Sequence, residues 1–198
     1  MHAWVTPLLT AVFSLWAGPP DGPVLPAPEH AITVYRYAAA TAPCPLDWHT
    51  LGGVAAVASN HGQITADEST GPITLDDSGN TSSPILSEAL DGQAGRARID
   101  DSEQGALDGD RDFDRAVGPF QFIPATWAQW GLDGNGDGTL DPNNVWDASV
   151  SAAALLCDHD VSGDLDGALT AYFGTDEYLA WFHRRADELR EPRTMSGA

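Results

Sequence analysis

Residues 118–147 decide the fold and read G-P-F-Q-F-I-P-A-T-W-A-Q-W-G-L-D-G-N-G-D-G-T-L-D-P-N-N-V-W-D, an aromatic segment with a glutamine followed by an acidic loop. In the loop, Asp133, Asn135 and Asp137 stand two residues apart, and Gly138 follows. This spacing lets a tight turn direct alternate side-chain oxygens toward one hard cation. It predicts an EF-hand-like calcium loop. The alternative is a surface turn, because Asn-Gly and Asp-Gly pairs occur in turns of every kind.

The other ligands of this loop follow from counting Asp133 as position 1. Thr139, at position 7, would offer its backbone carbonyl, and Asp141 stands at position 9, where a water-bridged ligand is common. Position 12 holds Asn144 instead of the bidentate Glu of the standard EF-hand. We therefore expect Asp147, at the start of the next apolar run, to supply the closing carboxylate.

The composition excludes one class of partner and indicates one domain. The chain has 198 residues and a net charge of −20, from 29 acidic residues against 9 basic residues that are all arginine. Nucleic acid is not expected as a partner, because phosphate binding needs a basic stripe. The length and the 42% hydrophobic content suffice for one well-buried core.

The N-terminus carries an apolar run at residues 3–18, followed by a Pro-rich stretch. The run is similar to the apolar core of a secretory signal peptide, although only His2 stands where basic residues normally precede it. It is short for a membrane span. We expect a protein that is secreted or associated with the cell envelope, without a stable membrane span in its mature form. A retained anchor and a misassigned start codon are the alternatives.

Apolar residues recur at helical spacing, and no strand-like alternation or internal repeat is found. We expect helices at 31–42, from an N-cap at Asp47 to about residue 59, after Pro124, at 146–157, at 167–174 and at 175–191. Gly62 suits a left-handed stop after the second helix. Between residues 63 and 116 the periodicity fails, which predicts a long loop with a helical turn at 83–92 and a solvated segment of Asp and Arg at 108–120. The fold is expected to be mainly α, with a signal-like segment and linker at 1–30, a domain at 31–191 and a polar tail at 192–198.

The chain has two cysteines, Cys44 and Cys157, and no C-x-x-C spacing. In an exported chain they would form one disulfide, which stabilises by about 4 to 5 kcal/mol in the loop-entropy model. Two buried free thiols are the alternative if the chain is not exported.

Five separated segments occur in a fixed order. They are V-A-S-N-H-G (57–62), S-P-I-L-S-E-A-L-D-G (83–92), R-A-V-G-P-F-Q-F-I-P-A-T-W (115–127), D-G-N-G-D-G-T-L-D-P-N-N-V-W-D-A (133–148) and T-A-Y-F-G (170–174). Together they resemble an actinobacterial lytic murein transglycosylase of the membrane-bound B type, within the lysozyme-like SLT superfamily. The resemblance covers about residues 31–185. It implies a lysozyme-like fold that cleaves the β-1,4 bond between N-acetylmuramic acid and N-acetylglucosamine in peptidoglycan and leaves a 1,6-anhydro product. The implied partner is the peptidoglycan glycan strand, and we expect a monomer.

The resemblance also implies a single catalytic carboxyl group. A protonated Glu donates to the glycosidic oxygen, and its carboxylate then accepts the proton of the sugar's own C6 hydroxyl. Relatives carry this Glu in a run V-E-S-x-H-G, and the matching position here is Ala58, which has no proton to give. Three explanations stay open: an engineered knock-out, a natural pseudoenzyme, or an acid displaced to Glu68 or Glu103.

The remaining site residues are carried over from the same segments. The residues implied to line the glycan site are Ser59, His61, Phe120, Gln121, Tyr172 and Phe173. Phe173 departs from the family, which has Asn there in a run A-Y-N. Relatives also have a calcium site closed by an Asp further along the chain, which agrees with Asp147.

The sequence leaves open whether the chain is an enzyme. The first reading is a lytic transglycosylase scaffold that is inactive as written. The second is a non-catalytic peptidoglycan-binding module. The third is a calcium-stabilised protein with a structural or partner-recruiting role.

Overall fold

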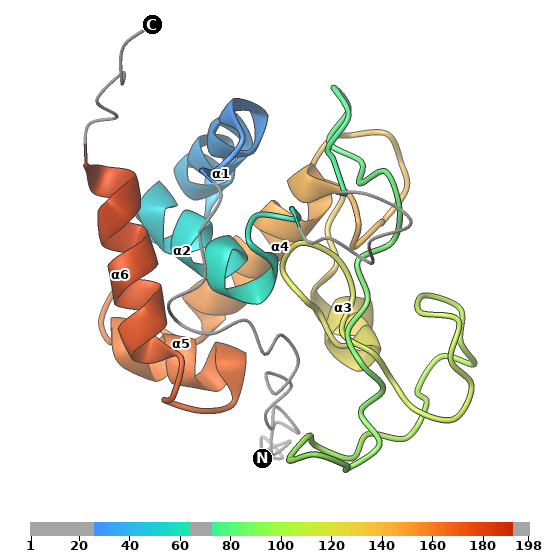
Figure 1. The fold of residues 1–198 in the computed structure, drawn as a ribbon. Coiled ribbons are helices and arrows are strands. Elements are labelled where there is room, and N and C mark those ends of the chain that lie inside the picture. Colours follow the sequence, from blue (N-terminus) through green and yellow to red (C-terminus); the bar gives the residue numbers. More distant parts are fainter. Residues whose placement is uncertain (1–25, 64–72, 192–198) are drawn as a thin grey trace, which may run out of the picture.

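The structure is a computed structural model, and it describes residues 26–63 and 73–191. The helices in these residues are α1 (Glu29–Thr41), α2 (Trp48–Ser59), α3 (Pro124–Trp130), α4 (Val145–Asp158), α5 (Leu165–Phe173) and α6 (Leu179–Arg190). Apart from them, the described residues form only isolated antiparallel bridges. Figure 1 shows α1, α2, α5 and α6 gathered on one side and α3 with the long loops on the other. The prediction of a mainly α fold is confirmed, and the architecture is consistent with a lysozyme-like domain.

Helix α2 is the central helix, since it packs against α1, α4 and α6. Two glycines let α6 approach its backbone. A Cβ at Gly52 would lie 2.5 Å from the Leu189 side chain, and one at Gly53 would lie 2.8 Å from Phe182. Real Cβ atoms do not approach so closely, so a larger residue at either position would push α6 away.

Both ends of α2 follow from its sequence. The predicted N-cap, Asp47, accepts a hydrogen bond from the His49 N–H at 3.1 Å. At the other end the left-handed turn begins before Gly62, because Asn60 and His61 already have φ values of 50° and 60°. The chain therefore leaves the helix one residue after Ser59.

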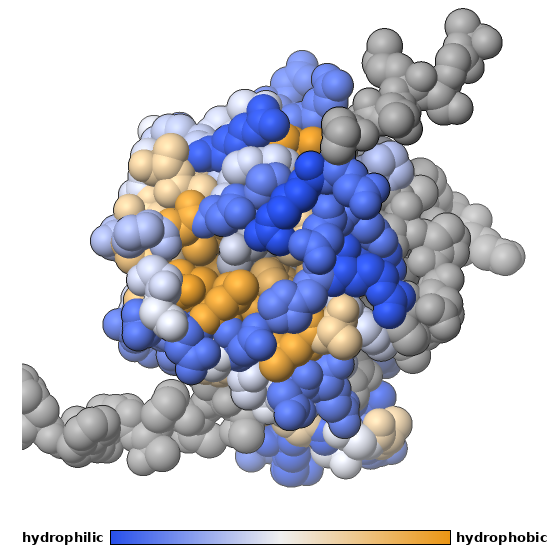
Figure 2. Space-filling view, turned by 90° about the vertical axis from the view of Figure 1, so that its left-hand side faces the viewer, coloured by the Kyte–Doolittle hydropathy of each residue, from blue (hydrophilic) through white to orange (hydrophobic). Residues whose placement is uncertain are grey.

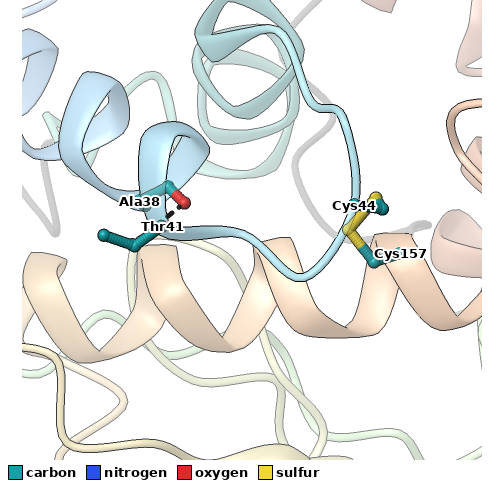
Figure 3. Close-up of a disulfide and its surroundings, with 4 residues drawn as sticks. All are labelled: Ala38, Thr41, Cys44 and Cys157. Carbon is teal, nitrogen blue, oxygen red and sulfur yellow. Dashed lines mark hydrogen bonds between the residues drawn. A yellow bond between two sulfur atoms is a disulfide. The ribbon is translucent and has the colours of Figure 1, made fainter.

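The disulfide between Cys44 and Cys157 is present, as predicted. It joins the connection between α1 and α2 to the last turn of α4 (Figure 3). Close by, the Thr41 hydroxyl donates to the Ala38 carbonyl at 3.4 Å and fixes the last turn of α1. The cross-link thus anchors the N-terminal helix pair to α4.

The helical turn expected at 83–92 is wrong, because this segment is extended. Leu86 forms an antiparallel bridge with Val117. Ile85 and Leu90 are buried, whereas Leu86 is 40% exposed. Tertiary pairing with the chain before Phe120 therefore overrides the local helical pattern.

The solvated segment expected at 108–120 is partly wrong, because Asp108 and Asp114 are buried. Asp108 accepts the N–H groups of Asp110 and Arg115, and Asp114 accepts both the N–H and the hydroxyl of Ser102 at 2.8 Å. The expected local pairing holds for Arg115 and Asp110, at 2.9 Å. The buried carboxylates satisfy backbone amides that no helix or sheet satisfies.

Figure 2 looks at the face of the molecule on which α6 lies, where hydrophilic residues surround a hydrophobic patch. None of the helices in the described ranges has the length and apolarity needed to cross a bilayer. The apolar run at 3–18 lies outside the described residues, so its role as a signal segment stays a prediction.

Candidate functional site

Ala58 lies in the last turn of α2 and belongs to the main core. Its side chain is 2% exposed, and the same cluster of buried side chains contains Phe120 and Phe122. A methyl group at this position can pack, but it cannot transfer a proton.

Ser59 ties the end of α2 to the G-P-F-Q segment. Its hydroxyl donates to the Pro119 carbonyl at 2.6 Å and accepts the Gly62 N–H at 2.8 Å. The side chain is fully buried. It holds two segments 60 residues apart in sequence at the position next to Ala58.

Gln121 closes a tight turn between Val117 and Phe122, whose backbones exchange hydrogen bonds of 2.8 and 2.9 Å. Gln121 has a left-handed backbone, with φ at 52°, and its Nε2 donates to the Gly118 carbonyl at 2.9 Å. A Cβ at Gly118 would lie 1.8 Å from the Pro142 carbonyl oxygen, so only glycine fits. This contact brings the turn against the end of the acidic loop.

Tyr172 holds the same turn from α5. Its hydroxyl donates to the Phe120 carbonyl at 2.9 Å. Burial raises the pKa of Tyr172, so the hydroxyl keeps its proton and remains a donor at neutral pH. Phe173 packs against Tyr172 with ring centroids 5.3 Å apart and is fully buried.

His61 is also buried, and its Nδ1 lies 3.3 Å from the Tyr35 hydroxyl. The Tyr35 ring in turn meets Phe120 edge-on at 5.9 Å. Tyr35 was not foreseen as part of the site. Its helical spacing from Ala31 and Ala38, both buried, was the signal that could have found it.

The structure thus brings the implied site residues together around the end of α2, which we call the α2 corner: Ala58, Ser59, His61, Phe120, Gln121, Tyr172 and Phe173. Only Tyr172 is more than marginally exposed, since Gln121 is 8% exposed and the others are buried more deeply.

The structure does not place either of the two candidate displaced acids, Glu68 and Glu103, beside Ala58 as a proton donor. Glu68 lies outside the described residues. The carboxylate of Glu103 accepts the N–H groups of Gly105, Ala106 and Leu107. Oxygens of Glu103, Asp101 and Asp114 lie within 4.8 Å of one another. The loop's own backbone amides and Ser102 account for this cluster.

The acidic loop is ordered by its own carboxylates. Asp133 accepts the N–H of Gly136 at 2.7 Å through one oxygen and that of Gly138 at 2.8 Å through the other. Asn135 accepts the Asp137 N–H at 3.0 Å, and Asp137 accepts the Thr139 N–H at 2.7 Å. The alternate side chains therefore turn inward along the loop.

Asp147 reaches back from the first turn of α4 into this loop. Its carboxylate oxygens accept the N–H of Gly134 at 2.8 Å and that of Asp141 at 3.0 Å. Asn144, at position 12, instead caps α4 through the Trp146 N–H and donates to Asn80. The residue at position 12 thus caps α4, and the carboxylate that lies against the loop is that of Asp147.

The electrostatics of Asp147 fit a bound cation. The residue is 1% exposed, and burial, with a smaller contribution from the charge of Asp133, raises the pKa of its carboxyl group. Within the described part of the chain, no arginine or histidine forms an ion pair with Asp133, Asp137 or Asp147. A hard cation would supply the missing positive charge, and the oxygen donors are of the type that calcium prefers.

One comparison with known proteins gives a match. Residues 103–173 match the model of the transglycosylase SLT domain family, a range that includes the G-P-F-Q turn, the acidic loop and Tyr172. No match was found among curated proteins or among solved structures. With the mainly helical architecture, the matched segment supports placing this chain in the superfamily of lytic transglycosylases with an SLT domain.

Proposed function

We propose that this chain is a peptidoglycan-directed lytic transglycosylase scaffold, related to the actinobacterial enzymes of the membrane-bound B type, that binds glycan strands without cleaving them. One observation carries the proposal. The α2 corner is held by the Ser59 hydroxyl and the Tyr172 hydroxyl, yet the residue that precedes Ser59 is alanine.

The missing chemistry follows from the reaction. A lytic transglycosylase needs one carboxyl group that first donates a proton and then accepts one, and Ala58 offers a methyl group. Loss of a general acid typically lowers the rate by about 10² to 10⁴, and by more where that acid acts alone. We therefore propose a pseudoenzyme or a knock-out.

Glycan contact is assigned to the residues of the corner that retain surface. Tyr172 is partly exposed and would offer its aromatic ring, and Gln121, which is 8% exposed and bonded to the Gly118 carbonyl, would offer the remaining edge of its amide. Aromatic rings and planar amides are the groups that commonly contact sugars in binding sites. Phe120 and Phe173 support these two residues from the core.

We also propose that the acidic loop binds one structural calcium ion. The ligands would be side-chain oxygens of Asp133, Asn135 and Asp137, the Thr139 carbonyl, and the carboxylate of Asp147. The ion would neutralise the buried charge of Asp147 and fix the start of α4. We also propose that the protein is a monomer. It would act outside the cytoplasm or at the cell envelope, where peptidoglycan lies.

Co-sedimentation with purified cell-wall sacculi tests the proposed function. The wild-type chain should pellet with sacculi and release no muropeptides. Gln121→Ala should weaken the binding, and Gln93→Ala, an exposed glutamine in the long loop, is the matched control that should not. A wild-type chain that stays in the supernatant would overturn the proposal.

The acidic loop favours a second candidate, a calcium-stabilised structural or partner-recruiting protein that does not bind glycan. This candidate predicts that calcium raises the midpoint of unfolding, because an ion that binds only the folded state stabilises that state. A midpoint that responds to calcium in a chain that ignores sacculi would favour this candidate over the first.

A further inference from the structure

A pocket lies between α1, the start of α2 and the end of α6. Its volume is about 600 Å³. The residues that matter here are Glu29, Thr33, Arg36, Trp48, Arg190 and Glu191. None of them belongs to the proposed glycan site or to the acidic loop.

Arg36 lines this pocket, and its guanidinium donates no hydrogen bond to any residue that the structure describes. Its guanidinium carbon lies 4.9 Å from the centre of the Trp48 ring. The ring of His49 also packs on Trp48, with ring centroids 3.9 Å apart. The His49 Nδ1 in turn lies 2.6 Å from the Asp47 carboxylate. The aromatic contact therefore restricts Arg36 without occupying its N–H groups.

The lack of an anionic partner sets Arg36 apart from most arginines in the structure. Those with a carboxylate within ion-pair distance are Arg96, Arg98, Arg115, Arg185 and Arg190. Among the described residues, Arg36 forms no ion pair and no hydrogen bond, although the chain carries 29 acidic residues. A restrained guanidinium whose donors are not used within the described part of the chain can bind a carboxylate in a planar, two-bond geometry.

Negative charge stands at the other end of the same pocket. Glu29 precedes Arg36 by seven residues on α1, which places the two residues on one face about 10 Å apart along the helix axis. Glu191 follows the end of α6 and lines the same pocket. Within residues 26–63 and 73–191, neither carboxylate forms an ion pair. The pocket thus offers one positive and two negative charges that no other described residue neutralises.

We propose that this pocket binds a short peptide with free ends, whose carboxylate meets Arg36 and whose ammonium group meets Glu29 and Glu191. The distance of about 10 Å corresponds to an extended peptide of about three residues at 3.3 to 3.6 Å each. The Thr33 hydroxyl already donates to the Glu29 carbonyl at 3.1 Å, so its lone pairs can accept a peptide N–H. A simple anion fits less well, because the two glutamates would repel it.

The source of such peptides follows if the proposed function holds. The peptides on the glycan strands of peptidoglycan are joined to the sugar through their N-terminus, so their free carboxyl group would meet Arg36 and the amino group of a diamino-acid side chain would meet the glutamates. The pocket would then bind the peptide part of the polymer while the α2 corner binds the glycan part. This identification rests on the proposed function, whereas the peptide site itself does not.

Titration of the ¹⁵N-labelled full chain with trialanine tests the site by NMR, with the Trp48 indole N–H as the reporter. Trialanine with free ends should give a saturable shift. The same peptide acetylated at its N-terminus and amidated at its C-terminus should bind at least about tenfold more weakly, since a charge-assisted pair contributes about 1.4 kcal/mol or more. Arg36→Gln should weaken the binding of free trialanine by the same factor. Arg111→Gln, which makes the same change in charge at an exposed arginine of the long loop, should not weaken it. Equal binding by the capped peptide, equal binding by Arg36→Gln, or no saturable shift would each overturn the proposal.

Sacculi separate this proposal from the proposed function. If trialanine binds through Arg36 and sacculi are not bound, the peptide site stands and the proposed function fails. If sacculi bind, Arg36→Gln should weaken co-sedimentation with intact sacculi but not with glycan strands from which an amidase has removed the peptides. Equal weakening with both polymers would overturn the assignment to peptidoglycan peptides.

Discussion

The α2 corner and the acidic loop are two sites held by the same kinds of hydrogen bond, yet they differ in how their chemistry is distributed. In the corner, buried hydroxyls of Ser59 and Tyr172 fix the backbone, and the proposed reaction depends on the single side chain at position 58. In the loop, three carboxylates and one amide share both the folding and the proposed cation binding.

The difference teaches why one site can lose its function while its shape persists. In the proposed glycan site, the alanine at position 58 supplies no proton, and the hydrogen bonds of Ser59 and Tyr172 do not involve its side chain. In the loop, the groups that would bind calcium are the groups that satisfy the backbone amides. Loss of a ligand there should therefore cost stability as well as binding.

The largest effect on stability is expected from Asp147→Ala. The change leaves the N–H groups of Gly134, Asn135 and Asp141 without their acceptor, and each such loss costs about 1 to 3 kcal/mol. We expect a loss of about 3 kcal/mol or more in urea unfolding, together with the loss of any calcium response. Asp137→Ala is the control, because Asp137 is exposed and should affect calcium binding more than the stability of the calcium-free chain. Equal stability losses in the two variants would contradict this account of the loop.

Ser59→Ala should destabilise the corner by about 2 kcal/mol. It leaves the buried Pro119 carbonyl without its donor, and the Gly62 N–H keeps only the Ser59 carbonyl as an acceptor. Tyr172→Phe removes only one donor, to the Phe120 carbonyl, and should cost about 1 kcal/mol. Urea unfolding in chelator measures both changes. If Tyr172→Phe were the more damaging, Ser59 would not be the main fastening of the corner.

The pH dependence should separate the loop from the corner. Because the folded-state pKa of Asp147 is raised, the folded chain binds more protons than the unfolded chain above the ordinary Asp pKa of about 3.9. The contribution of Asp147 to the free energy of unfolding is fully present below that pH, and in chelator it is lost as the pH rises through the raised pKa. Calcium should reverse the trend, because it binds the carboxylate.

Burial also raises the pKa of Asp114, so part of the fall in chelator has that source. Asp147→Asn isolates the contribution of Asp147: the variant should show a smaller fall and no reversal by calcium. An Asp147→Asn variant whose midpoint in chelator falls as steeply as that of the wild type between about pH 4 and pH 7, the range above the ordinary Asp pKa, would contradict this assignment.

The smallest effect on stability is expected from Gln121→Gly. The left-handed backbone of Gln121 costs about 1 kcal/mol, which glycine relieves, while the hydrogen bond from Nε2 to Gly118 is lost. The two changes should nearly cancel, to within about 1 kcal/mol in urea unfolding. Binding to sacculi should still fall. A variant that binds sacculi as the wild type does would remove Gln121 from the glycan site.

The main helices could be predicted from the sequence to within a few residues, since they depend on near neighbours. The Asp47 cap, the extent of α1 and α2, and the pairing of Cys44 with Cys157 were all predicted. The long loop could not be predicted. Asp114 is buried because its partner Ser102 lies in another part of the loop, and no local pattern reports such a contact.

In the candidate site, too, residues with a chemical signature could be predicted and residues that contribute through packing could not. The sequence predicted Asp147 as the residue that closes the acidic loop, and the structure places its carboxylate against the loop amides. It did not predict Tyr35, whose contact with His61 joins α1 to the α2 corner. A side chain that contributes through packing carries no chemical signature, so only the three-dimensional arrangement identifies it.

The measurement that tests the central claim most directly is the release of anhydromuropeptides from sacculi by Ala58→Glu and by the wild type. If the scaffold lacks only its proton donor, the variant should release anhydromuropeptides at a rate at least about 10²-fold above the wild type, which should release none above background. Ala58→Gln, which has the size of Glu without its acid, should remain inactive. A folded Ala58→Glu variant that binds sacculi and releases nothing, or a wild type that already cleaves them, would contradict the account.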